Sequence, residues 1–137
     1  MAMEMLINID VPDLDAGIAF YQQALGLQLK RRLFGNAVAE LAGAAVPVFL
    51  LEKAPQSAPA PEAGRRDYGR HWTPVHFDLV VENLEPAVAR AVAAGATLEG
   101  AITDYVWGRH ACLSDPFGHG FCLLEWRGKA YDELAEA

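Results

Sequence analysis

The sequence is poor in cysteine, in basic residues and in long apolar runs. Two cysteines among 137 residues cannot build a disulfide framework, so we expect both to be free thiols. The formal net charge of -7 disfavours binding to nucleic acid or to anionic lipid. No apolar run approaches the roughly 20 residues of a membrane span, and MAMEMLINID lacks the parts of a secretory signal. These absences predict a cytoplasmic protein whose partner is a small molecule or another protein chain.

Apolar residues, by contrast, make up 53% of the chain, and they recur in a duplicated pattern. INIDVPDLDAGIAFYQQALGL (7–27) and FDLVVENLEPAVARAVAAGATL (77–98) both predict an alternating strand, a polar turn, a helix and a glycine. VFLLEK (48–53) and FCLLEW (121–126) follow in the same order, which makes Phe49 equivalent to Cys122. The shared order and spacing favour a duplicated unit over chance similarity of short apolar strands.

Each half is predicted to be a βαβββ module. The first module (3–53) has expected strands at 3–11, 28–34, 37–41 and 47–52 and a helix at 13–25. The second (73–127) has expected strands at 73–81, 97–105, 108–114 and 120–126 and a helix at 84–94. The long loop 54–72 is either a solvated linker or a flap that carries arginines and aromatic residues over a pocket. The tail 128–137 is expected to hold a short helix.

Alternation along the strands sorts the side chains between two faces. The face away from the helices carries polar residues at equivalent places in the two modules: Asn8, Asp10, His76 and Asp78. If the turn DPFGHG pairs Asp115 with His119, Cys112 falls directly opposite Cys122. The residues expected to share one face are then His76, His110, Cys112 and Cys122.

The opening DVPDLDAGIAFYQQALGL, the ending DPFGHGFCLLEW and the paired modules resemble the vicinal oxygen chelate superfamily. That superfamily includes glyoxalase I, bleomycin-type resistance proteins and extradiol dioxygenases. The resemblance covers nearly the whole chain. It implies an α+β fold in which two tandem βαβββ modules form a curved, cup-shaped mixed sheet with helices outside. It also implies a homodimer and a ligand held in the cup, often with a divalent metal.

The resemblance places the superfamily's metal ligands, which are His, Gln or Glu, at Leu6, Phe49, His76 and Cys122. Only His76 matches. Leu6 and Phe49 offer no lone pair, and Mg²⁺, Mn²⁺ and Ca²⁺ disfavour sulfur. A slip of the alignment to Glu52 would supply a carboxylate, but the repeat pairs Glu52 with Glu125 at strand ends. We therefore expect no cofactor, although a divalent metal stays possible.

Other uses of this face stay open. A metal site, if present, would use His76, His110, Cys112 and Cys122, a mixed nitrogen and sulfur set that suits Zn²⁺. Free cysteines are often small buried apolar residues, and this is the interpretation that we favour. His76 and Asp78 are the candidate catalytic residues, as an acid–base pair. The polar residues either bind a ligand or satisfy one another.

The leading hypothesis is a metal-independent small-molecule binder, in the manner of the drug-sequestering resistance proteins. Aromatic side chains on the cup face could stack on a ring-bearing ligand. The expected ligand-binding residues are Leu6, Asn8, Asp10, Phe49, His110, Cys122 and Trp126. The first alternative is a glyoxalase-like lyase or isomerase that uses His76 as acid and base or in a non-standard metal site. The second is a protein-interaction module.

Overall fold

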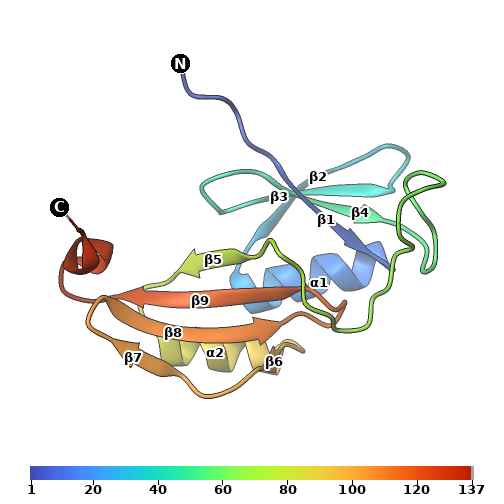
Figure 1. Ribbon diagram of the computed structural model, residues 1–137. Helices are drawn as coiled ribbons and strands as arrows, with labels where there is room; N and C mark the ends of the chain where they lie inside the picture. Colours follow the sequence, from blue (N-terminus) through green and yellow to red (C-terminus); the bar gives the residue numbers. More distant parts are fainter. Residues whose placement is uncertain (137) are drawn as a thin grey trace. The chain divides into compact units, whose positions relative to one another are not determined.

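The computed structural model describes residues 1–136, which form two compact units, Met1–Gly69 and a second unit that begins at Arg70. Each unit holds one helix and one mixed sheet (Figure 1). Unit 1 contains β1 (Ile7–Val11), α1 (Leu14–Leu25), β2 (Gln28–Leu33), β3 (Val38–Ala42) and β4 (Val48–Glu52). Unit 2 contains β5 (Phe77–Val80), α2 (Leu84–Ala93), β6 (Thr97–Leu98), β7 (Thr103–Tyr105), β8 (Gly108–Ser114), β9 (Gly120–Trp126) and the 3-10 helix η1 (Ala130–Leu134). The predicted α+β fold of tandem βαβββ modules is confirmed, and no described helix has the length and apolarity of a membrane span.

The two sheets repeat one topology. Their strand orders are β1-β4-β3-β2 and β5-β9-β8-β6, with β7 also paired to β8. In both, the first strand lies parallel to the last, so that Asn8 pairs with Phe49 and Asp78 pairs with Cys122. This register confirms that Phe49 and Cys122 occupy equivalent positions, as the sequence repeat predicts.

Three strands differ from the prediction by more than one residue at an end. The first strand of each module begins at Ile7 and Phe77, four residues later than expected, because the parallel partner strand begins only at Val48 and Gly120. Pro47, just before β4, has no N–H to extend the ladder. The expected strand 97–105 is divided into β6 and β7, and Gly100, with φ of 102°, lies in the interruption. A parallel or antiparallel strand extends only as far as its partner does.

Each helix covers one face of its own sheet, and local signals in the sequence set its ends. The carboxylate of Asp13 accepts a hydrogen bond from Ala16 N at 2.9 Å at the start of α1. Gly26 ends the same helix in the left-handed conformation, with φ of 71°. At the sheet-facing side of α1, Gly17 allows the close approach of Leu50 and Val11, whose side chains lie 3.2 Å from where a Cβ would be.

A glutamate at the end of the last strand caps the helix in both modules. Glu52 accepts a hydrogen bond from Leu14 N at 2.8 Å, and Glu125 accepts one from Leu84 N at 2.9 Å. A carboxylate there satisfies an unpaired helical N–H and interacts favourably with the helix dipole. Glu52 therefore points to the helix, as its match with Glu125 implies, and is not a metal ligand on the opposite face.

We expect Glu125→Ala to lower the free energy of unfolding by about 1 kcal/mol, the usual cost of losing a helix cap. Within the described residues Asn83 makes no side-chain cap bond, so Glu125 is the main cap of α2. Glu52→Ala should cost less, because Asp13 also caps α1. Urea unfolding checks both, with Glu62→Ala, in the exposed loop, as the control. Equal losses in the three variants would contradict the capping role.

Candidate functional site

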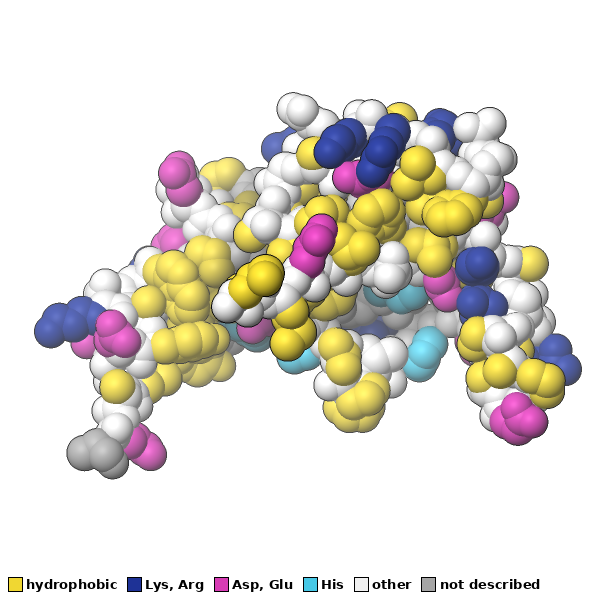
Figure 2. All heavy atoms as spheres, turned by 90° about the horizontal axis from the view of Figure 1, so that it is seen from above, with side chains coloured by type: hydrophobic (Ala, Val, Ile, Leu, Met, Phe, Trp, Pro, Cys, Tyr) yellow, Lys and Arg dark blue, Asp and Glu magenta, His cyan; other side chains and the backbone are white. Residues whose placement is uncertain are grey.

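A cleft of about 360 Å³ opens on the sheet of unit 2, on the face away from α2. It is lined by side chains from the loop before β5, from the segment between β6 and β7 and from strands β8 and β9. Among them are Arg70, Trp72, His76, Glu99, His110, Cys112 and Cys122. Figure 2 shows histidine side chains along a recessed part of one face, beside hydrophobic ones. The cleft thus combines imidazole rings, an aromatic ring and two thiols.

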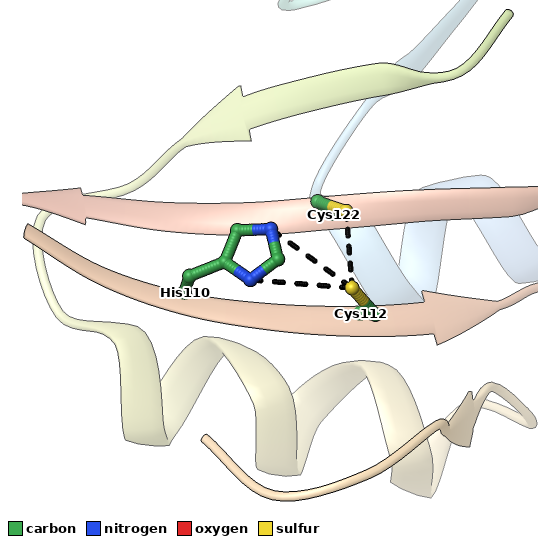
Figure 3. Close-up of side chains that lie close together, drawn as sticks. All are labelled: His110, Cys112 and Cys122. Atoms are coloured by element: carbon green, nitrogen blue, oxygen red, sulfur yellow. Dashed lines mark hydrogen bonds between the residues drawn. The ribbon is translucent and has the colours of Figure 1, made fainter. Parts of the chain in front are cut away.

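The two cysteines face each other across strands β8 and β9. Asp115 N donates to His119 O at 2.8 Å, which begins the predicted register. Cys112 then pairs with Cys122, and their sulfurs lie 3.5 Å apart (Figure 3). His110 lies two residues before Cys112 on β8, and its side chain points to the same face of the sheet. The predicted grouping of these three side chains is confirmed.

Cys122 is poorly suited to act as a nucleophile. Burial, together with the neighbouring Cys112 and Asp78, raises the pKa of its thiol to about 12. Only the thiolate attacks electrophiles, and with this pKa the thiolate is scarce at neutral pH. Cys122 is 6% exposed, so in the metal-free protein it behaves as a buried, protonated side chain.

His76 and Asp78 contact each other at the edge of the same cleft. Nε2 of His76 lies 3.3 Å from Oδ1 of Asp78. Their spacing of two residues on one strand face did not by itself predict this contact. The side chains are 55% and 39% exposed, so both can reach a ligand. Their ligand atoms and the sulfur of Cys122 all lie within 4.8 Å of one another. The geometry suits an imidazole oriented by a carboxylate.

Glu99 is a site residue that the sequence did not reveal, and Arg70 was indicated only as one of the arginines of the long loop. Arg70 binds Glu99 through two hydrogen bonds, of 2.7 and 3.0 Å. The guanidinium lowers the pKa of the Glu99 carboxyl. Gly120 makes room for Arg70, because a Cβ at this position would lie 2.5 Å from the guanidinium. The arginines in the loop indicated a charged site, but the sequence did not show that Glu99, between β6 and β7, is the partner of Arg70.

Hydrogen bonds hold the last part of the long loop, although most of its residues are exposed. Arg66 binds Asp10 at 2.7 Å within unit 1, and the hydroxyl of Tyr68 donates to Lys53 O at 2.8 Å. Arg70 and Trp72 line the cleft of unit 2. The flap interpretation of the loop therefore holds for these last two residues.

The remaining predicted ligand-binding residues lie elsewhere. Leu6, Asn8, Asp10 and Phe49 belong to unit 1, where Asp10 is paired with Arg66. Phe49 lies between Asn8 and Glu40 in the register of that sheet, and Glu40 binds Arg31 at 2.6 Å. Their part in a ligand site stays a prediction.

Trp126 belongs to an aromatic cluster at the end of β9, together with Tyr105, Trp107 and Tyr131. Its ring centroid lies 4.7 Å from that of Tyr131 and 6.1 Å from that of Trp107. Trp107 in turn lies 6.4 Å from His110, which links the cluster to the cleft. A direct role of Trp126 in ligand binding also stays a prediction.

The four positions at which the superfamily resemblance places metal ligands do not fit a hard cation. Leu6 and Phe49 carry no donor atom, and Cys122 offers sulfur in place of a carboxylate oxygen. Glu52, the remaining carboxylate candidate, is bonded to the start of α1. An octahedral site for Mg²⁺ or Mn²⁺ cannot be built from His76 alone.

We expect iodoacetamide to label Cys122 slowly at pH 7 and faster as the pH rises toward 12, because its raised pKa keeps it protonated. Asp78→Asn should speed the labelling at pH 8, since it removes a negative charge that raises this pKa. Peptide mass spectrometry after timed labelling measures both rates. Labelling of Cys122 at pH 7 as fast as that of free cysteine would contradict the assignment.

The comparisons with known proteins agree with this fold. The model of the glyoxalase-like domain family matches residues 6–124. The anthracycline biosynthesis protein DauV of Streptomyces sp. strain C5 is 30% identical over 136 residues, covering 95% of this chain and 43% of that protein. An uncharacterized protein of Mycobacterium bovis is 42% identical over 52 residues, covering 37% of this chain and 34% of that protein. The chain spans less than half the length of these curated relatives.

Solved structures show the same fold at low sequence identity. The fosfomycin resistance protein FosX of Listeria monocytogenes superposes with a TM-score of 0.71 at 16% identity, over 93% of this chain and 95% of that one. TnmS3, an antibiotic binding protein from Streptomyces sp. CB03234, superposes with a TM-score of 0.66 at 21% identity, over 93% and 98%. The chain therefore belongs to the glyoxalase-like domain family.

Proposed function

We propose that this protein binds a ring-bearing small molecule in the cleft of unit 2 and needs no hard divalent cation to do so. The observation that carries the proposal is the cleft itself, in which aromatic and imidazole rings line a volume of about 360 Å³. Small-molecule sites begin at roughly 300 Å³ and combine apolar walls with a few polar groups. The names of two similar proteins, one in anthracycline biosynthesis and one antibiotic binding, support a small-molecule ligand.

Each side of the cleft has a separate part in this proposal. Trp72 is 80% exposed and offers a free ring face on which a flat ligand can stack. His76 and His110 can donate or accept hydrogen bonds at the ligand's polar atoms. The Arg70–Glu99 pair closes a polar edge of the cleft. The homodimer and the cytoplasmic location expected from the sequence stay part of the proposal.

We expect Trp72→Ala to weaken binding of a planar probe by about threefold to tenfold, because a stacked ring pair contributes about 0.5 to 1.5 kcal/mol. The probe is doxorubicin, an anthracycline whose own fluorescence reports binding, titrated with protein that a chelator has stripped of metal. Phe34→Ala is the matched control, since Phe34 is an equally exposed aromatic residue (81%) in unit 1.

Two results would contradict the proposal of metal-independent ring binding. One is binding of the probe only after Mn²⁺ or Mg²⁺ is added back. The other is unchanged affinity in Trp72→Ala and in His110→Ala, which alters a second residue of the cleft. If neither the probe nor a panel of smaller planar compounds binds, the protein-interaction alternative gains support.

A second candidate function is proton transfer on a bound carbonyl compound, by a lyase or isomerase. The observation that favours it is the 3.3 Å contact between His76 and Asp78 beside the cleft. A positioned imidazole typically accelerates proton transfer by about 100-fold to 10,000-fold.

If His76 acts in this way, we expect the protein to exchange protons next to the carbonyl of methylglyoxal for deuterium in heavy water. His76→Ala should abolish the exchange, and Asp78→Asn should slow it at least about tenfold, because the imidazole loses its orienting partner. Proton NMR measures the rate, and His119→Ala is the control. Absence of exchange by the wild-type protein would exclude proton transfer on this class of compound and leave binding as the function.

A further inference from the structure

Three side chains on strands β8 and β9 bring soft donor atoms together on one face of the cleft (Figure 3). The sulfurs of Cys112 and Cys122 lie 3.5 Å apart, and the sulfur of Cys112 lies 3.9 Å from Nε2 of His110. One ligand atom from each residue lies within 4.8 Å of the other two. The three atoms therefore form a small triangle.

Two sides of this triangle are close in length to the sides of one face of a tetrahedral zinc site. Bonds of about 2.3 Å to sulfur and about 2.0 Å to nitrogen, at tetrahedral angles, put two sulfurs about 3.8 Å apart and a sulfur about 3.5 Å from a nitrogen. The observed separations of 3.5 Å and 3.9 Å differ from these by a few tenths of an ångström. The third separation, between Cys122 and His110, is at most 4.8 Å.

We propose that His110, Cys112 and Cys122 bind a thiophilic divalent cation, zinc above all, with its fourth coordination position open to the cleft. Thiolate and imidazole are donors that zinc prefers and that Mg²⁺, Mn²⁺ and Ca²⁺ do not. Two thiolates and a neutral imidazole balance the charge of the cation. The resulting neutral centre suits Cys122, which is 6% exposed.

The protein holds these ligands in place before any cation arrives. Cys112 and Cys122 are a directly opposed pair in the β8–β9 ladder. The ring of His110 lies against Trp107 and Tyr105, with centroids 6.4 and 6.5 Å away. The side chains thus lose little conformational freedom on binding. The cleft supplies the path by which a cation enters.

The proposed site shares only Cys122 with the metal positions that the superfamily resemblance implies. Two of its three ligands, His110 and Cys112, come from β8, whereas the implied positions lie on the first and last strands of the modules. His76 contacts Asp78 and is left out of the ligand set. The site goes beyond the proposed function, because ring binding in the same cleft needs no metal.

Cobalt titration of the tag-free, full-length protein tests the site. The protein is stripped of metal and kept reduced with a phosphine that does not bind metals. We expect one Co²⁺ per chain, with the thiolate-to-cobalt charge-transfer band and the intense visible bands of a tetrahedral ion, and displacement of Co²⁺ by Zn²⁺. Loss of any one ligand should weaken zinc binding at least about 100-fold, in Cys112→Ser, Cys122→Ser and His110→Ala alike. Mutation of a residue that only contacts a metal ligand weakens binding by at most about that much. His119→Ala, in the turn after β8, should bind zinc as the wild type does.

X-ray absorption of the zinc-loaded wild type provides a measurement that does not depend on any variant folding. We expect two sulfur neighbours at about 2.3 Å and one nitrogen at about 2.0 Å. A zinc ion surrounded by nitrogen and oxygen alone would overturn the proposal. So would the absence of charge-transfer bands in the reduced wild type, or their survival in both cysteine variants. Because the metal titrations contain no organic ligand and the doxorubicin titrations contain chelator, failure of either proposal is seen separately.

Discussion

The antiparallel pairing of β8 with β9 is the constraint on which the site depends, and Asp115 sets it. Its buried carboxylate accepts hydrogen bonds from Phe117 N at 2.8 Å and His119 N at 2.9 Å, which fixes the turn between the strands. From this turn the register brings Cys112 opposite Cys122. Because side chains alternate along a strand, a slip of one residue would turn Cys122 toward α2 and remove it from the cleft. A local turn thus decides the chemistry of a face several residues away.

The duplication separates what the fold requires from what the site requires. Both modules keep the parallel pairing of first and last strands and the glutamate that caps the helix. The opposite faces of the sheets have diverged. In unit 1 the row that contains Phe49 continues to Glu40, which is buried and paired with Arg31. In unit 2 the equivalent row carries Cys122 and Cys112. Packing against the helix is therefore shared, whereas the donor atoms offered to a ligand are not.

Features that depend on neighbouring residues could be predicted from the sequence. The caps of α1 at Asp13 and Gly26, the register after the DPFGHG turn and the equivalence of Phe49 with Cys122 are all local or repeated patterns. Features that depend on distant partners could not. The first strands begin only where their parallel partners β4 and β9 begin, and Arg70 meets Glu99 across 29 positions of the chain. The contact of His76 with Asp78 depends on side-chain rotation, which strand alternation does not specify.

The two proposed uses of the cleft follow from the two states that its sulfur atoms can adopt. Without a cation, the buried Cys122 is a neutral thiol, and the face near it is apolar enough for a ring-bearing molecule. A bound cation would turn the thiols into thiolates, release protons and present a neutral, Lewis-acidic centre with an open position to the cleft. A neutral flat ligand would then prefer the cleft without a cation, and a ligand with a donor atom would prefer the cleft with one. If the proposed site binds zinc, sulfur in place of hard oxygen donors at this position changes which cation the fold uses rather than removing metal chemistry from it.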